Sequence, residues 1–269
     1  MKSFVYAAPH QSVFLITTNY EDLENLMRLK YGKYILSGLT DKRVDFYLEV
    51  CKNVNNYQIA TGTKIINTSD PIVEIDRFIF QNNKFDTKIF AIHGAAIEYK
   101  GKAFLLIAPT TGGKTTLTGY LLSRGMGYIT EDCILMDRAS FHIHPFTLPL
   151  QIREDGMNVL IQNNVRLHQI QQLHIGSLQR YIYDPIDCVH STLPLGGMFF
   201  IERSDENNLL SDMTKYDSIS ALLRSPMISY DLSSDYLHFI AKLSQHRCGL
   251  LQYRDMDFVY KTIQSEYDK

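Results

Sequence analysis

One stretch of this sequence combines glycines, a lysine and hydroxyl side chains at a spacing that could bind phosphate groups. Residues 108–115 read APTTGGKT, which fits the Walker A pattern except that Ala108 replaces the usual first glycine. Glycines let backbone N–H groups converge on phosphate oxygens, while the lysine reaches the β and γ phosphates. The alternative is a glycine turn that only joins a strand to a helix. We favour a nucleotide site, made of Thr110, Thr111, Gly112, Gly113, Lys114, Thr115 and Thr116.

An acidic pair, Glu131-Asp132, begins sixteen residues after Thr115. One helix and one return strand fit into this interval, so the pair could face the loop across a bound nucleotide. One carboxylate could hold a magnesium ion with Thr115, and the second could accept a proton from an attacking hydroxyl. Without the loop, the same pair would be a solvated strand end.

The elements that must position these residues follow from the apolar pattern. Residues 88–99 and 102–108 are expected to form two strands joined by a turn at Lys100-Gly101, the second covered on both faces. A helix with leucines on one face should follow the loop and end at Gly125, and a further strand should begin at Tyr128. The order strand, loop, helix, strand is typical of an α/β nucleotide fold.

The rest of the chain suggests a small N-terminal α+β region over 1–86 and a larger domain over 87–269. The N-terminal region has strand-like runs around 14–16 and 46–48 and helical patterns at 22–30 and 71–79. Further strands are expected at 147–153 and 197–202, and helices at 214–224, 235–246 and 255–267. For residues 156–183 we expect short helices and an exposed connection.

Composition excludes several classes of protein. The chain has 269 residues, 45% of them apolar, and 27 basic against 29 acidic side chains give a net charge of −2. A nucleic-acid or membrane-surface binder would normally carry a positive excess, so neither partner is expected. No apolar stretch reaches the roughly 18 residues of a membrane helix, and we expect a cytoplasmic protein. The four cysteines are far apart, which favours reduced thiols.

Together these motifs resemble the bacterial HPr kinase/phosphorylase family. The resemblance rests on His93-Gly94-Ala95-Ala96, the glycine loop and Glu131-Asp132. It implies a P-loop kinase core with a mixed central sheet, of the phosphoenolpyruvate carboxykinase-like fold, and a serine kinase that uses ATP and Mg²⁺. It also implies that Lys114 binds phosphates, that Thr115, Glu131 and Asp132 hold the metal, and that His93, Glu131 and Asp132 act in catalysis.

One segment departs from the family pattern. HPr-directed members carry Glu-Ile-Arg-Gly after the acidic pair, and the nearest counterpart here is Gln151-Ile152-Arg153-Glu154. Arg153 and Arg203 are candidates to face the phosphates, although such arginines are also often surface salt-bridge partners. The departure favours a diverged kinase, similar to those that modify ribosomally made peptides such as lasso peptide precursors. The expected partner is a serine-bearing peptide or small protein, and family analogy suggests a homo-oligomer.

Three other functions fit the same motifs. A kinase acting on a small alcohol or amino acid needs the same loop and acids. A carboxykinase-like enzyme would need further metal ligands, for which His142 and His144 are the candidates. A non-catalytic regulator would bind ATP and transfer nothing. Tyr181 and Tyr183 are candidates for a peptide-binding surface.

Overall fold

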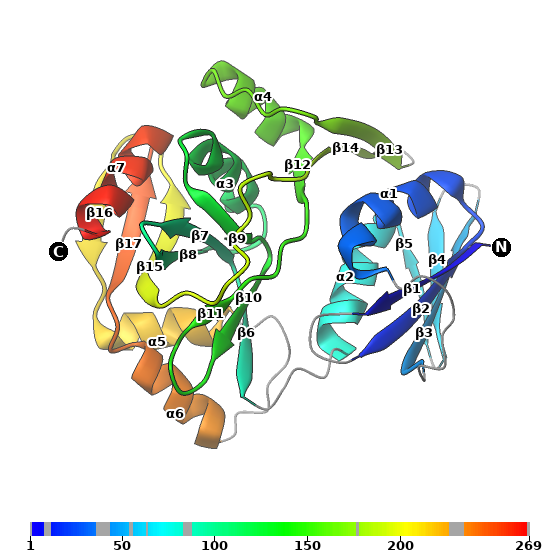
Figure 1. The fold of residues 1–269 in the computed structure, drawn as a ribbon, viewed down its shortest axis with the longest axis horizontal. Coiled ribbons are helices and arrows are strands. Elements are labelled where there is room, and N and C mark those ends of the chain that lie inside the picture. The colour runs from blue at the N-terminus through cyan, green and yellow to red at the C-terminus, as the bar shows by residue number, and fades with distance from the viewer. Residues whose placement is uncertain are drawn as a thin grey trace. The chain divides into compact units, whose positions relative to one another are not determined.

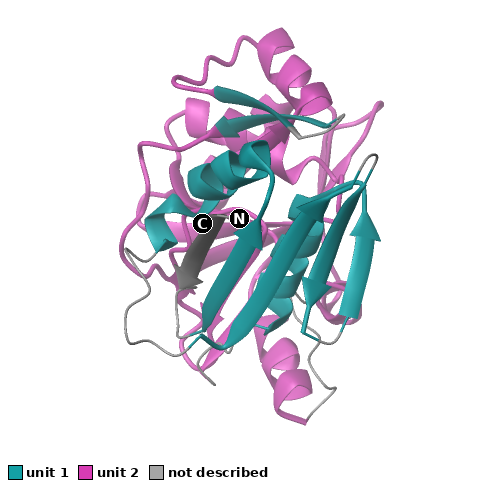
Figure 2. Ribbon diagram, turned by 90° about the vertical axis from the view of Figure 1, so that its right-hand side faces the viewer, with its two compact units in different colours: residues 1–86, 171–182 teal, residues 87–170, 183–269 magenta. Residues whose placement is uncertain are grey.

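The computed structural model describes residues 2–7, 12–35, 44–53, 56–62, 64–82, 88–175, 178–225 and 234–267. It is a mixed α/β protein, and its five-stranded and six-stranded sheets each contain both parallel and antiparallel pairs. Two compact units form the chain (Figure 2). The first comprises Met1–Asp86 and Gln171–Ile182, and the second Thr87–Ile170 and Tyr183–Lys269.

The first unit is a five-stranded sheet with helices packed on it (Figure 1). Its strands, in spatial order, are β1 (Lys2–Ala7), β2 (Val13–Thr18), β3 (Phe46–Lys52), β4 (Tyr57–Thr61) and β5 (Lys64–Thr68). Only β2 and β3 run parallel. The expected helices are confirmed as α1 (Glu21–Tyr31), which η1 (Gly32–Tyr34) follows, and α2 (Pro71–Asn82). An ion pair between the buried Lys30 of α1 and the partly buried Asp76 of α2 joins the two helices.

A hairpin from later in the chain belongs to this unit. Its strands are β13 (Gln171–Ile175) and β14 (Leu178–Tyr183), and β13 contacts α1. Arg180 of β14 donates to Asp70 at 2.9 Å. Of the short helices and exposed connection expected in 156–183, one helix, α4 (Glu154–Gln162), and a mostly exposed connection over 163–170 are present. The hairpin that follows them was not predicted.

The second unit is built on a six-stranded sheet in the order β16-β17-β15-β8-β7-β9. Three of its four inner strands, β17, β15 and β8, run parallel to one another. In chain order the strands are β7 (Ala95–Tyr99), β8 (Lys102–Ile107), β9 (Gly127–Thr130), β15 (Leu195–Arg203), β16 (Leu209–Asp212) and β17 (Cys248–Tyr253). A smaller sheet has the order β11-β10-β6, with β6 (Ile89–His93), β10 (Cys133–Asp137) and β11 (Ile143–His144).

The single strand expected at 88–99 is wrong: it is two strands in two sheets. The chain leaves the small sheet after His93 and enters the large one at Ala95. A Cβ on Gly94 would lie 2.7 Å from the Ile134 side chain and 3.0 Å from the Leu106 carbonyl oxygen. Only glycine fits this corner without displacing its neighbours, so Gly94 allows the chain to change sheets.

The other expected elements agree in type, with small shifts at their ends. They are α3 (Lys114–Ser123), β12 (Leu150–Arg153), α5 (Lys215–Leu223), α6 (Ser234–Leu243) and α7 (Met256–Tyr267). Strand β8 is buried from Ala103 to Ile107, which confirms the strand predicted to be covered on both faces. Cys133 and Cys248 are buried, and all four cysteines are free thiols. Within the described residues, no helix has both the length and the apolar character needed to cross a bilayer.

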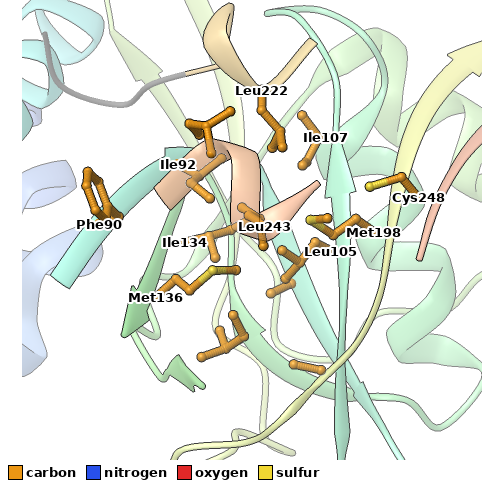
Figure 3. Packing of buried hydrophobic residues seen from close by; sticks show 14 of the residues in the cluster. Phe90, Ile92, Leu105, Ile107, Ile134, Met136, Met198, Leu222, Leu243 and Cys248 are labelled. Carbon is orange, nitrogen blue, oxygen red and sulfur yellow. The ribbon is translucent and has the colours of Figure 1, made fainter. Parts of the chain in front are cut away.

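The core of the second unit lies between its sheets and helices α5 and α6 (Figure 3). Leu105 and Ile107 of β8 meet Ile134 of β10 and Leu243 of α6 there. The six-stranded sheet also contacts α3 and α7. Strand β8 is thus fixed by packing and by two strand neighbours, and the loop that follows it starts from a rigid position.

Candidate functional site

The glycine loop joins the end of β8 to the first turn of α3. The N–H of Gly112 donates to the Pro109 carbonyl at 3.0 Å. A Cβ on Gly112 would lie 2.7 Å from that of Ala108, so the glycine gives Ala108 its room. Gly113 precedes the helix with φ of 83°, which an L side chain rarely adopts. Both glycines are therefore required by the backbone path, and they leave the N-terminus of α3 open to an anion.

Lys114 folds back over the loop. Its ammonium donates to the carbonyl oxygens of Ala108 at 2.8 Å and Pro109 at 3.1 Å, and its Nζ lies 3.0 Å from His93 Nε2. The side chain is 5% exposed. Burial lowers the pKa of Lys114, and the charges of Asp132 and Glu131 oppose that shift. The lysine is thus a desolvated charge held at the start of α3.

His93 and Asp132 lie next to each other, each at a point where the chain passes between the small sheet and the six-stranded sheet. The carbonyl oxygen of Asp132 accepts the N–H of Gly94 at 3.3 Å and lies 3.2 Å from His93 Nδ1. Asp132 has φ of 70°, in the left-handed region that aspartate tolerates better than most residues. Strands β9 and β10 place Glu131-Asp132 between them, just as β6 and β7 place Gly94. Residues far apart in the sequence are brought together by the crossing of two sheets.

The partners of His93 determine its tautomer. A carbonyl oxygen only accepts, so Nδ1 carries the proton toward Asp132; a charged ammonium only donates, so Nε2 accepts from Lys114. Burial, and then the charge of Lys114, lower the pKa of His93, against the opposing effect of Asp132. His93 is therefore a neutral, oriented imidazole between the lysine and the acidic turn.

Glu131 lies against the first turn of α3. The Thr115 hydroxyl donates to its Oε1, and the carboxylate is buried. A hydroxyl and two carboxylates are the hard oxygen ligands that Mg²⁺ prefers, so the chemistry of this set fits that ion. Among the described residues there is no cluster of three or more His, Cys, Asp or Glu side chains able to hold a metal, and His142 and His144 belong to none.

The two candidate arginines, Arg153 and Arg203, are exposed. Each lies at the end of an element that neighbours α3 or β8. Arg153 precedes α4, and a Cβ on Gly156 of α4 would lie 2.5 Å from the Thr116 hydroxyl, so the first turns of α3 and α4 touch. Arg203 ends β15, the parallel neighbour of β8. Among the described contacts, neither Arg153 nor Arg203 bonds to Lys114 or to the acidic pair. Tyr181 and Tyr183 lie on β14, and Tyr181 accepts from Gln179 at 2.5 Å.

A further residue of the site is missing from the sequence-based candidates. Tyr253 ends β17, and its hydroxyl reaches Gly113. The alternating run Cys248–Tyr253 between two predicted helices is the signal that could have identified the strand. Its proximity to the loop depends on the order of strands in the sheet.

Comparisons with known proteins give distant structural likenesses only. No protein-family model and no curated protein matches the chain. Among solved structures, the Hpr(Ser) kinase/phosphatase from Coxiella burnetii is similar, with 10% sequence identity and a TM-score of 0.33. The match covers 65% of this chain and 94% of that chain. These values are too low to assign the chain to a family.

Proposed function

We propose that the protein is an ATP- and Mg²⁺-dependent kinase that phosphorylates a serine hydroxyl of a peptide or small protein. One observation carries the proposal: Lys114, at the start of α3, lies beside His93, while Glu131 contacts Thr115 of the same turn. Nucleotide-binding and proton-accepting groups thus share one loop and one acidic turn, as phosphoryl transfer requires.

Backbone and charge support binding of a triphosphate. The positive φ of Gly113 and the N-terminus of α3 suit an anion. Phosphate oxygens would compete with the carbonyls of Ala108 and Pro109 for the Lys114 ammonium, because hydrogen bonds between two charged groups are the stronger. Residues 110–116 would enclose the phosphates.

The oxygen atoms of Thr115, Glu131 and Asp132 would hold the magnesium ion. Bound with the nucleotide, it would supply positive charge against the phosphate oxygens. Glu131 already orients the Thr115 hydroxyl.

The acidic turn would accept the proton. As the serine oxygen bonds to the γ-phosphorus, the bond from that phosphorus to the leaving ADP oxygen breaks, and the serine proton passes to a carboxylate of the turn. His93, fixed by Asp132 and Lys114, would orient this turn. Arg153 or Arg203 would add charge stabilisation from an element end.

Two substitutions test the proposal. We expect Lys114→Ala to abolish transfer. Asp132→Asn should leave ATP affinity within about threefold, since asparagine tolerates the positive φ, and lower turnover by at least about a hundredfold. The exposed Lys242 provides the control Lys242→Ala. The measurement is mass spectrometry of serine peptides incubated with ATP.

The same assay separates the alternatives. Transfer to free serine but to no peptide would favour a small-molecule kinase, and nucleotide binding without transfer to any hydroxyl would favour a regulator. Full activity of Asp132→Asn would remove Asp132 from the mechanism and leave Glu131 as the only carboxylate of the turn that could accept the proton.

A further inference from the structure

Tyr253 is held rigidly at the end of a parallel strand. It pairs with Arg203 of β15, and its carbonyl accepts the N–H of Ser204 at 2.8 Å. Directly after it, the Asn208 side chain accepts the N–H groups of Arg254 and Asp255 at 2.8 and 3.0 Å. The backbone on both sides is therefore fixed, and the ring has a defined place on the sheet.

The Tyr253 hydroxyl reaches the last glycine of the loop. A Cβ on Gly113 would lie 2.9 Å from this oxygen, and no other described atom beyond the neighbouring residues lies within 4 Å. The residue is only 4% exposed, yet among the described residues its hydroxyl has no hydrogen-bond partner. With no described protein partner, this hydroxyl is free to donate to a ligand that binds at the loop.

The surroundings favour an anionic ligand. Burial raises the pKa of Tyr253, against the opposing charge of Arg203, so the phenol is a neutral donor at neutral pH. It lies at the N-terminus of α3, and the guanidinium of Arg203 is near enough to act on its ionisation. Donors and positive potential converge here, at the carboxyl ends of parallel strands, where α/β sheets bind ligands.

We infer that the Tyr253 hydroxyl donates a hydrogen bond to a phosphate oxygen of the nucleotide bound at the glycine loop. This inference rests on the proposed function and adds a phosphate-contacting residue outside the loop, from a strand late in the chain. Tyr253 acts on the phosphates and not on the base or the ribose.

The test is the Tyr253→Phe variant, studied by isothermal titration calorimetry with ATP and with inorganic tripolyphosphate. We expect both ligands to bind about tenfold more weakly, because a hydrogen bond to a charged group is lost. The matched control is Tyr236→Phe, since Tyr236 is also 4% exposed but lies in the core against Phe90. The control should bind both ligands as the unaltered protein does.

Thermal unfolding gives an independent measurement. Because the hydroxyl has no described protein partner, Tyr253→Phe should melt at the same temperature as the unaltered protein or higher without ligand. A lower melting temperature would mean that the hydroxyl serves the fold, and would contradict the inference.

The binding outcomes are distinguishable. If the unaltered protein binds neither ATP nor tripolyphosphate, both the proposed function and this inference are wrong. If it binds both, and Tyr253→Phe binds them equally well to within about twofold, only the inference fails. Weaker binding of ATP with unchanged binding of tripolyphosphate would also overturn it, because the contact would then be to another part of the nucleotide.

Discussion

A single imidazole, His93, joins the two halves of the candidate site. Its Nδ1 faces the Asp132 carbonyl and its Nε2 faces the Lys114 ammonium, at 3.2 and 3.0 Å. Only a neutral histidine with the proton on Nδ1 satisfies both partners. His93 can therefore transmit a change at the lysine to the acidic turn.

Replacing His93 by alanine should separate binding from turnover. Lys114 keeps its two carbonyl partners, so we expect ATP affinity to fall less than about tenfold. The acidic turn loses its side-chain partner, so kcat should fall by about 10²–10⁴-fold, the usual range for a group that assists proton transfer. Steady-state kinetics with a serine peptide measures both effects.

The exposed His168 of the same unit supplies the control His168→Ala, which should change neither parameter. A kcat unchanged in His93→Ala would show that the imidazole has no part in turnover and only packs at the sheet corner.

At the scale of elements, local patterns predicted what surrounds the loop. The apolar run of β8, the glycines and the leucine face of α3 all lie within a short stretch of chain, so the sequence contains their full signal. The position of the acidic turn opposite the loop was predicted from the length of chain between them, which fits one helix and one strand. These features depend on neighbours in sequence, and the structure agrees with them.

The features that were not predicted depend on tertiary contacts. Nothing in the apolar run around His93-Gly94 marks a change of sheet except the glycine, because the partners Ile134 and Leu106 are distant in sequence. Strand β17 was missed, and with it Tyr253, whose proximity to Gly113 depends on strand order. The hairpin of β13 and β14 was also missed, since most of its described side chains are only partly buried and its alternation is weak.

The close packing around Gly94, where the chain changes sheets, predicts that any side chain at residue 94 lowers the stability of the fold. In Gly94→Ala the new methyl would lie 2.7 Å from Ile134 and 3.0 Å from a backbone oxygen, which cannot move freely. We expect about 1–3 kcal/mol less stability, the usual cost of overpacking. Denaturant unfolding measures it.

Gly197→Ala is the control, because its Cβ would lie 3.6 Å from Phe104, an ordinary contact. It should change stability by less than about 0.5 kcal/mol. Equal stability of the two variants would mean that the corner can relax, and that Gly94 is not needed for the turn.

At the scale of the whole molecule, each unit has its own core, and the core of the second contains several buried titratable groups. Burial raises the pKa of Cys248, Tyr236 and Tyr253 above their ordinary values. In the unfolded chain these groups would ionise at their ordinary values, about 8.5 for a thiol and 10 for a phenol. The folded state then holds more protons than the unfolded state at alkaline pH, so stability must fall as the pH rises through this range.

Cys248 permits a direct test of this loss of stability at alkaline pH, because its thiol lies in the core beside Met198 and Leu243. At pH 7, Cys248→Ala should be less stable than the unaltered protein by about 1–2 kcal/mol, the cost of a small cavity. The difference should shrink above about pH 8.5, by at most about 1.4 kcal/mol per pH unit, because only the unaltered chain gains a thiolate on unfolding. Urea unfolding between pH 7 and 10 measures both. A difference that stays constant over this range would mean that the folded thiol ionises as readily as the unfolded one, which burial in an apolar core opposes.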